Sequence, residues 1–154
     1  MELSVRCYLL DQSWRILLVR HDDGQLRTLP GGHAEWKETV YDALKREIDE
    51  ELGLWITLVW VENGISTSNV APLPLPISIH KVIYEHRTRW HTEKVEYFFF
   101  ARMNGEISTI DKQEIKEFKW FESDEILEME EDTEIHGFIQ EILDQNLDLL
   151  EIIG

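Results

Sequence analysis

The sequence predicts one domain of the α+β class, in which a β-sheet is combined with a few helices. The length of 154 residues suits one domain, and 43% hydrophobic residues are enough for a core. Segments rich in β-branched and aromatic residues alternate with segments whose apolar residues recur at helical spacing. Because no repeat, low-complexity tract or linker divides the chain, we expect residues 1–154 to form a single domain.

Six segments carry the composition of β-strands, with many β-branched and aromatic residues between turn-forming residues. We expect strands at 3–10, 15–20, 55–65, 76–85, 94–103 and 117–122.

The first helix is predicted over residues 39–52. Thr39 and Asp42 have capping-box-like spacing at its start, and Gly53 is placed to end it. One face is apolar and consists of Val40, Leu44, Ile48 and Leu52. A second helix is predicted over residues 132–146 from a core-facing stripe of Ile135, Phe138, Ile139, Ile142 and Leu143.

The first helix carries three acidic residues on one side. Glu47, Glu50 and Glu51 stand at i, i+3 and i+4, within about 100° of arc on a helix. By angle Glu51 falls between Val40 and Leu44, so it is expected at the rim of the core. The opposite, solvated arc is expected to hold Asp42, Lys45, Arg46 and Asp49. Repulsion among the three carboxylates would be relieved by a hard divalent cation, for which Mg²⁺ is suited because it prefers carboxylate oxygen, water and phosphate as ligands.

This stretch resembles the Nudix box, G-x5-E-x7-R-E-U-x-E-E-x-G-U, where U is a bulky aliphatic residue. The match spans residues 32–54 and is complete at Gly32, Glu38, Arg46, Glu47, Ile48, Glu50, Glu51, Gly53 and Leu54. Residues 16–20 and 29–32 before the box also resemble this family. The resemblance implies the Nudix fold, an α-β-α sandwich whose mixed β-sheet is flanked by helices.

The resemblance also implies roles for the residues of the motif. Glu50 and Glu51 are expected as metal ligands, and Glu47 as a third ligand or as the general base. The carbonyl of Gly31 would be a further ligand, in a turn formed by residues 30–32 that brings backbone close to metal and phosphates. Structural roles are implied for Gly32 and Gly53, and for an ion pair that holds the loop against the helix, formed by Glu38 and Arg46.

For the reaction, the resemblance implies hydrolysis of a nucleoside diphosphate linked to another moiety, by attack of water on one phosphorus. Mg²⁺, for which Mn²⁺ can substitute, would clamp phosphate oxygens and lower the pKa of bound water, while a carboxylate accepts the proton. The chain is thus expected to be a pyrophosphohydrolase, with Glu47, Glu50 and Glu51 as its catalytic residues.

A further acidic ligand is expected outside the box, just before a strand that carries a tryptophan. Glu114 is the choice and Glu117 the reserve, although both would equally suit an exposed loop and strand edge in an acidic protein. After Trp120, residues 123–126 resemble the start of the short helix in the family's C-terminal pattern.

Substrate contacts are assigned to Arg20, Trp36 and Trp90, the tryptophans because an aromatic ring can stack on a nucleobase. Trp90 lies in a locally basic stretch that also suits a solvated hairpin tip. The markers of subfamilies that act on ADP-ribose, dinucleoside polyphosphates or coenzyme A match poorly. A nucleoside triphosphate or related nucleotide is therefore the default substrate; an ADP-ribose or nucleotide-sugar pyrophosphatase is the alternative.

The formal charge of −16 argues against duplex nucleic acid as a partner, because such binding depends on Lys and Arg at phosphates. No targeting segment or long apolar run is present, so we expect a cytoplasmic chain without membrane insertion. The only cysteine, Cys7, excludes an internal disulfide and is expected to be buried. The expected partner is a small nucleotide, and the sequence leaves a homodimer open.

Three other classes compete with the hydrolase. A Nudix-fold regulatory domain that binds nucleotides would lose the metal carboxylates, which are intact here. An isoprenyl diphosphate isomerase of the same fold would usually need a pocket-facing catalytic cysteine and a modified box. A structural domain with an acidic helix would not place acids on the apolar side.

Overall fold

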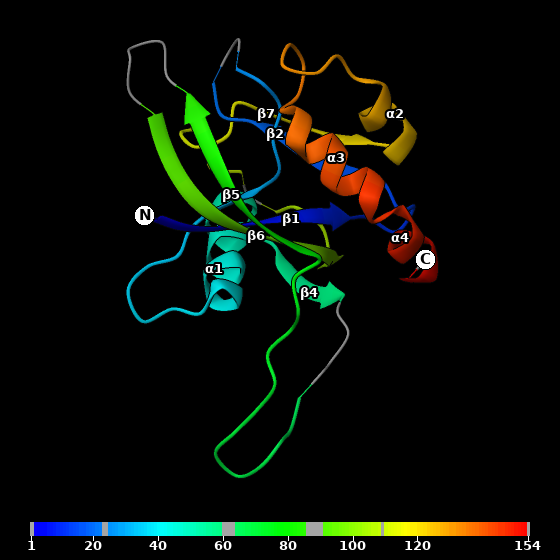
Figure 1. The fold of residues 1–154 in the computed structure, drawn as a ribbon. Coiled ribbons are helices and arrows are strands. Elements are labelled where there is room, and N and C mark those ends of the chain that lie inside the picture. Colours follow the sequence, from blue (N-terminus) through cyan, green and yellow to red (C-terminus); the bar gives the residue numbers. More distant parts are fainter. Residues whose placement is uncertain (1, 23–24, 60–63, 86–90, 109, 154) are drawn as a thin grey trace.

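The computed structural model describes all residues except 1, 23–24, 60–63, 86–90, 109 and 154. Its described part contains a seven-stranded sheet with helices packed against it (Figure 1). The strands are β1 (Glu2–Leu10), β2 (Ile16–Arg20), β3 (Gly31–His33), β4 (Trp55–Val59), β5 (Ser78–Glu85), β6 (His91–Asn104) and β7 (Glu117–Phe121). The helices are α1 (Val40–Leu52), α2 (Ser123–Glu128), α3 (Gly137–Gln145) and α4 (Leu147–Ile153).

The sheet is mixed, as expected. Its central strands β1 and β6 run parallel, with register from Glu2↔Lys94 to Leu10↔Arg102, and every other pairing is antiparallel among the described strands. At the outer edge of β6, β5 and β4 pair with successive parts of this long strand. At the outer edge of β1, β3 pairs with residues 4–6, and β2 with Leu10 alone. The sheet therefore splays open between β1 and β2.

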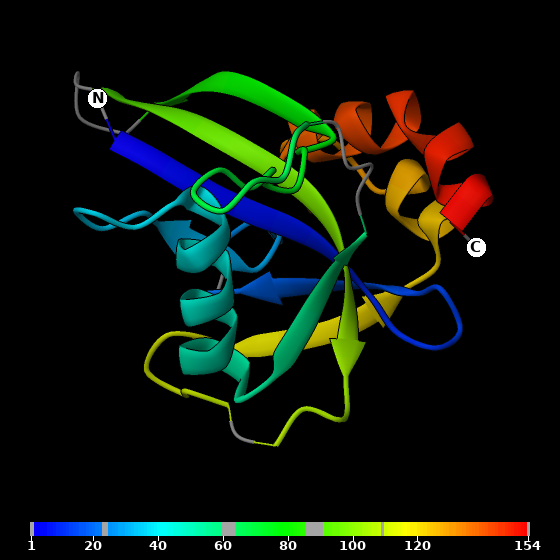
Figure 2. The same cartoon turned by 90° about the horizontal axis from the view of Figure 1, so that it is seen from below.

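Two apolar cores lie on opposite faces of the sheet, because alternate side chains of a strand point to opposite sides. One core joins Val5, Cys7 and Leu9 of β1 to α1, and the other joins Tyr8 and Leu10 to α3. Figures 1 and 2 show α1 and α3 on the two sides of the sheet. The predicted sandwich of helix, sheet and helix is thus confirmed, and Cys7 is fully buried as expected.

The strand predictions are confirmed for all six segments, with shifts at their ends. The largest error concerns β4, which ends at Val59, whereas the prediction extended to residue 65. Residues 60–63 lie outside the described part, but Ile65 is exposed and belongs to no strand. The strand β3 was not predicted. Residues 30–32 were expected to form a turn, yet Gly31 and Gly32 pair with Arg6 and Val5 of β1.

Helix α1 begins and ends where the sequence predicts. Thr39 and Asp42 form a reciprocal capping box, and Gly53 ends the helix in the left-handed conformation (φ 58°). The short helix after Trp120 is also confirmed as α2. The prediction of the second helix, over residues 132–146, was wrong at its start. The observed helix α3 begins at Gly137, because Asp132 has φ 62° and residues 131 and 135 form a bridge. The following helix α4 was not predicted.

Within the part of the chain that is described, none of the helices has both the length and the apolar character needed to cross a membrane.

Candidate active site

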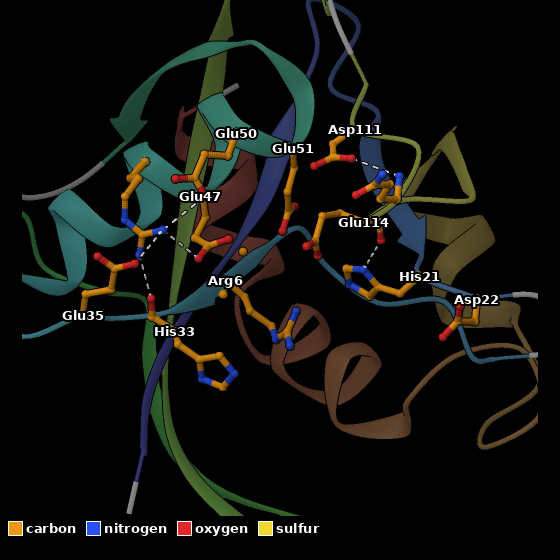
Figure 3. Close-up of a pocket in the computed structure, with 14 residues that line it drawn as sticks. Arg6, His21, Asp22, His33, Glu35, Glu47, Glu50, Glu51, Asp111 and Glu114 are labelled. Atoms are coloured by element: carbon orange, nitrogen blue, oxygen red, sulfur yellow. Dashed lines mark hydrogen bonds and ion pairs between the residues drawn. The ribbon is translucent and has the colours of Figure 1, made fainter.

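A cavity of about 750 Å³ opens beside β3 and the last turns of α1, where β1 and β2 separate. Its walls come from β1, the loop after β2, β3, α1 and the loop before β7 (Figure 3). Among the residues that the structure describes, seven acidic side chains but only two arginines line it, so an anionic ligand would need bound cations. The lining residues are Arg6, His21, Asp22, Gly31, Gly32, His33, Glu35, Arg46, Glu47, Glu50, Glu51, Asp111, Gln113 and Glu114.

The two glycines of β3 allow the backbone to pass between β1 and α1. Gly31 has φ 145°, and a Cβ atom there would lie 2.0 Å from the carbonyl oxygen of Val5. At Gly32 a Cβ atom would lie 2.4 Å from Cδ of Glu47, so the glycine leaves room for that carboxylate. The backbone thus comes close to strand β1 at Gly31 and to the Glu47 carboxylate at Gly32.

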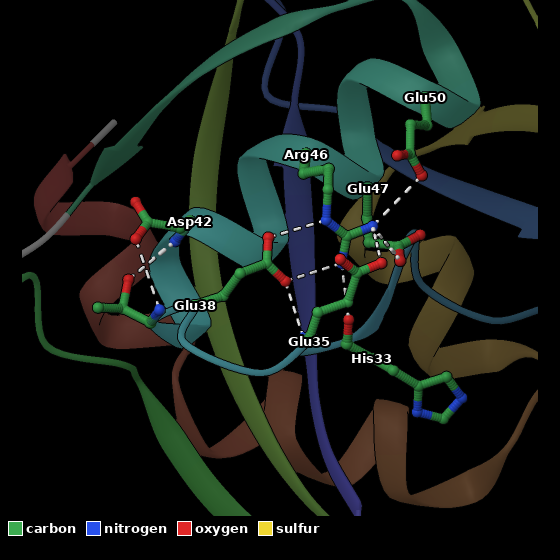
Figure 4. A network of polar contacts seen from close by, with 8 residues as sticks. His33, Glu35, Glu38, Asp42, Arg46, Glu47 and Glu50 are labelled. Atoms are coloured by element: carbon green, nitrogen blue, oxygen red, sulfur yellow. Dashed lines mark hydrogen bonds and ion pairs between the residues drawn. The ribbon is translucent and has the colours of Figure 1, made fainter.

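Arg46 ties the loop after β3 to α1 (Figure 4). Its Nε donates to Glu38 Oε2 at 2.8 Å, and its Nη2 donates to Glu38 Oε1 at 3.0 Å and to the His33 carbonyl at 2.9 Å. The predicted ion pair of Glu38 with Arg46 is confirmed, and it lowers the pKa of the Glu38 carboxyl. Arg46 was expected on the solvated arc of α1, but these contacts leave its side chain only 23% exposed.

The same guanidinium also binds two of the carboxylates in the expected metal site. Arg46 Nη1 donates to Glu47 Oε1 at 3.0 Å and to Glu50 Oε2 at 3.3 Å. Glu50 remains mostly exposed at the rim, whereas Glu47 is largely buried. Arg46 therefore offsets the repulsion that the sequence predicts for these two residues, even without a metal ion.

Glu51 is buried at the rim of the core, as its position on α1 predicts, with 4% of its surface exposed. Its Oε2 atom is buried and has no hydrogen-bond partner among the described residues. Burial raises the pKa of Glu51 to about 8, and the neighbouring carboxylates of Glu47 and Glu114 contribute in the same direction, while Arg6 and the Gly31 backbone oppose them. Such a carboxylate is costly unless it is protonated or meets a cation.

Glu114 reaches this site through the loop before β7. The backbone N–H of Asp111 donates to the Glu51 carbonyl at 3.0 Å, and the N–H of Glu114 donates to the Asp111 carbonyl at 3.0 Å. The loop is thereby fixed to the end of α1, and Ile115 is buried beside it. Burial raises the pKa of Glu47, and Glu50 and Glu114 add to this rise, while Arg46 opposes it.

The cavity thus brings together Gly31, Glu47, Glu50, Glu51 and Glu114, to which the sequence assigns metal binding. Among the described residues, however, no three acidic, histidine or cysteine side chains are close enough in this conformation to hold a metal ion. The reason is visible in Figures 3 and 4, where Glu50 turns to Arg46 while Glu51 extends into the cavity.

Of the residues expected to contact substrate or to replace Glu114 as a ligand, those that the structure describes do not line the cavity. Arg20 and Glu117 face each other across β2 and β7, with Nη2 of Arg20 at 3.7 Å from Glu117 Oε1, and neither lines the cavity. Trp36 is 87% exposed in the loop before α1, beside a separate hollow that shares His33 and Glu35 with the cavity. Trp90 lies outside the described residues.

Five described cavity residues outside the box were not identified from the sequence: Arg6, His21, Asp22, Asp111 and Gln113. Arg6 stands on β1 among apolar residues, and the other four lie in loops, so no periodicity or spacing pointed to them. The Nδ1 atom of His21 lies 2.7 Å from the Glu114 carbonyl, to which it must donate because a carbonyl only accepts. Only the three-dimensional structure brings these residues to the box.

The donor set suits a hard divalent cation. The buried Oε2 atom of Glu51 lacks a hydrogen-bond partner in the described part of the chain, and the surrounding groups include carboxylates and backbone carbonyls, which Mg²⁺ and Mn²⁺ accept as ligands. A cation bound there would favour the charged form of Glu51, which burial disfavours. Glu51 and Glu50 are the candidate ligands, Glu47 is a third ligand or the general base, and Glu114 faces Glu51 across the cavity.

Comparisons with known proteins agree with this architecture. The family model of the NUDIX domain matches residues 2–142. No curated protein matches the sequence.

Solved structures with the same fold include a NUDIX-family hydrolase from Clostridium perfringens, with 21% identity, coverage of 99% of this chain and 97% of that chain, and a TM-score of 0.72. A MutT protein from Methanosarcina mazei has 17% identity, coverage of 96% and 94%, and a TM-score of 0.69. An ADP-ribose pyrophosphatase from Streptococcus suis has 20% identity, coverage of 88% and 79%, and a TM-score of 0.54. With the family model matching nearly the whole length, the chain belongs to the Nudix family of hydrolases.

Proposed function

We propose that residues 1–154 act as one Nudix domain that hydrolyses the pyrophosphate linkage of a nucleotide, with Mg²⁺ as the cofactor. The observation that carries this proposal is the buried Oε2 atom of Glu51, which has no hydrogen-bond partner among the described residues and lies in a cavity that six other described acidic side chains line. A purely structural acid would be exposed or paired with a base. A bound cation would stabilise the charged form of such a carboxylate.

Each carboxylate has a distinct part in the proposed reaction. When bound, Mg²⁺ would neutralise charge on the phosphate oxygens and lower the pKa of coordinated water. Glu51 and Glu50 would be the first ligands of the ion. To bind it, the Glu50 carboxylate would have to give up its contact with Arg46. Glu47 is well placed to accept a proton, because Arg46 donates a hydrogen bond to its carboxylate, Gly32 leaves room for it, and burial raises its pKa.

The preferred substrate is a nucleoside triphosphate or a related nucleotide. The volume of about 750 Å³ lies in the range typical of small-molecule sites. A nucleoside diphosphate attached to a sugar is the second candidate, since a structural relative is described as an ADP-ribose pyrophosphatase. Arg20 and Trp36, which lie outside the cavity, stay proposals for substrate contacts, and so does Trp90.

The test is a panel of nucleoside triphosphates, ADP-ribose, nucleotide sugars and dinucleoside polyphosphates, incubated with the chain and Mg²⁺. Products are separated by chromatography, which identifies the bond that was cut. We expect one class to be cleaved, with complete loss of hydrolysis in chelator and recovery on addition of Mg²⁺ or Mn²⁺. Absence of cleavage across the panel, with nucleotide binding retained, would favour a regulatory domain.

A further inference from the structure

Of the two cavity arginines among the described residues, Arg6 is the one that is not bound by the acidic residues of the site. The other, Arg46, lies within 4.0 Å of four carboxylates, those of Glu35, Glu38, Glu47 and Glu50. Arg6 instead forms one ion pair, between its Nε and Oε1 of Glu96 at 3.3 Å. Its positive charge is therefore available to a phosphate that enters this cavity.

The position of Arg6 is set by the central strands. It stands on β1 opposite Gly31, on the side of the sheet that Tyr8 also faces, while Glu51 belongs to the α1 side. Both side chains nevertheless line the same cavity, which lies where β1 and β2 separate. In Figure 3 the Arg6 guanidinium is directed away from Glu47 and Glu51.

Protein groups hold the Arg6 guanidinium in place but do not use all of its N–H donors. Nη1 donates to the Leu29 carbonyl at 2.8 Å, Nε donates to Glu96, and the Tyr84 hydroxyl provides a third contact. A guanidinium has five N–H donors, so at least two remain for a ligand. The Arg6 side chain is 12% exposed, which leaves it accessible from the cavity.

Glu96 has no contact with solvent and serves to fix this arginine. Its side chain is 0% exposed, and Oε1 accepts both from Arg6 and from the Tyr84 hydroxyl at 2.9 Å. Its other oxygen, Oε2, is buried without a partner among the described residues. Burying such a pair seldom adds stability in comparison with apolar residues, so an arrangement of this kind indicates a need to hold the arginine in place.

We propose that Arg6 binds a phosphate oxygen of the substrate at the wall opposite the carboxylates, and that Glu96 and Tyr84 are positioning residues for its guanidinium. This inference rests on the proposed function and names a contact that the Nudix box does not contain. The diphosphate would then lie across the gap in the sheet, with its cation on the Glu51 side and Arg6 on the other. A planar guanidinium suits this task because it can donate two parallel hydrogen bonds to a phosphate.

The test compares steady-state kinetics of three variants with those of the wild type. Arg6→Lys keeps the charge but loses the planar fork, and the double variant Arg6→Met/Glu96→Gln removes both buried charges without leaving one unpaired. Arg27→Met is the matched control, since Arg27 is also partly buried and pairs with Glu117 at 3.2 Å outside the cavity.

We expect KM to rise about 10- to 100-fold in the double variant, as for loss of hydrogen bonds to a charged group, with kcat nearly unchanged. Arg6→Lys should fall between it and the wild type, and Arg27→Met should retain the wild-type KM. A fall in kcat at unchanged KM would indicate structural damage alone and would overturn the proposal, as would wild-type kinetics in the double variant.

A binding arm separates failure of this inference from failure of the proposed function. The affinity for imidodiphosphate, a diphosphate analogue with a P–N–P bridge, is measured by calorimetry in Mg²⁺ for the same four proteins. If the wild type cleaves nothing in the panel but binds this probe, weaker binding only in the two Arg6 variants still supports the phosphate contact. Equal binding by all four proteins, or no binding by the wild type, would overturn it.

Discussion

The replacement Glu51→Gln should stabilise the metal-free protein, and the gain should depend on pH. The pKa of Glu51 is raised from its usual value of 4.5 to about 8 in the folded protein, chiefly by burial. Folding therefore takes up a proton between these two values, and the stability contributed by this group falls as the pH rises from 4.5 to 8. Glutamine has nearly the same shape and no charge, so it removes this penalty.

The size of the effect follows from the shift. At about 1.4 kcal/mol per pKa unit, the charged form of Glu51 costs up to about 5 kcal/mol above pH 8. Chemical denaturation in chelator should show little difference between variant and wild type near pH 4.5. At pH 9 the variant should be more stable by several kcal/mol.

Addition of Mg²⁺ should reverse this order. Binding to the folded state stabilises the wild type by mass action, whereas the variant lacks the charged ligand. The matched control is Asp49→Asn, which lies exposed on the same helix outside the cavity and should change the free energy of unfolding by less than about 0.5 kcal/mol. If the difference in free energy of unfolding between Glu51→Gln and the wild type does not change with pH, the pKa of Glu51 is not raised by burial.

Three further replacements test the framework around the site. Gly32→Ala places a Cβ atom 2.4 Å from Glu47 Cδ, and displacement of that carboxylate should lower turnover about 100-fold; unchanged kcat would contradict this. Tyr8→Phe removes the donor to the buried Ile139 carbonyl at 2.7 Å and should cost about 1–3 kcal/mol in chemical denaturation, with an unaltered midpoint as the opposing result. Arg46→Lys loses the paired hydrogen bonds to Glu38, so thermal unfolding should occur at lower temperature; no change would mean that a single charge is sufficient.

The local features of α1 could be predicted from the sequence because they depend on residues close together in the chain. The Thr39 cap, the stop at Gly53 and the burial of Glu51 all follow from helical periodicity and short-range hydrogen bonds. The start of α3 could not be predicted in the same way. Ile135 fits the apolar stripe of the predicted helix, and it is buried. It lies, however, in an extended segment before α3 and forms a β-bridge with Arg27.

The rest of the cavity depends on long-range pairing that periodicity does not reveal. Arg6 meets Glu96 because β1 and β6 are parallel neighbours, although the two residues lie 90 positions apart. Glu114 reaches Glu51 through a backbone hydrogen bond between the loop at Asp111 and the end of α1. The sequence therefore indicated the carboxylates of the box, whereas the arginine on the opposite wall required the structure.

The most direct test of the central claim is the rate of Mg²⁺-dependent hydrolysis of the best substrate in the panel. It is compared for the wild type, Glu51→Gln and Asp49→Asn. Asp49→Asn should match the wild type, while Glu51→Gln should lose turnover although it remains folded. Activity of Glu51→Gln within a few fold of the wild type, or undiminished hydrolysis in chelator, would contradict a metal-dependent site centred on Glu51.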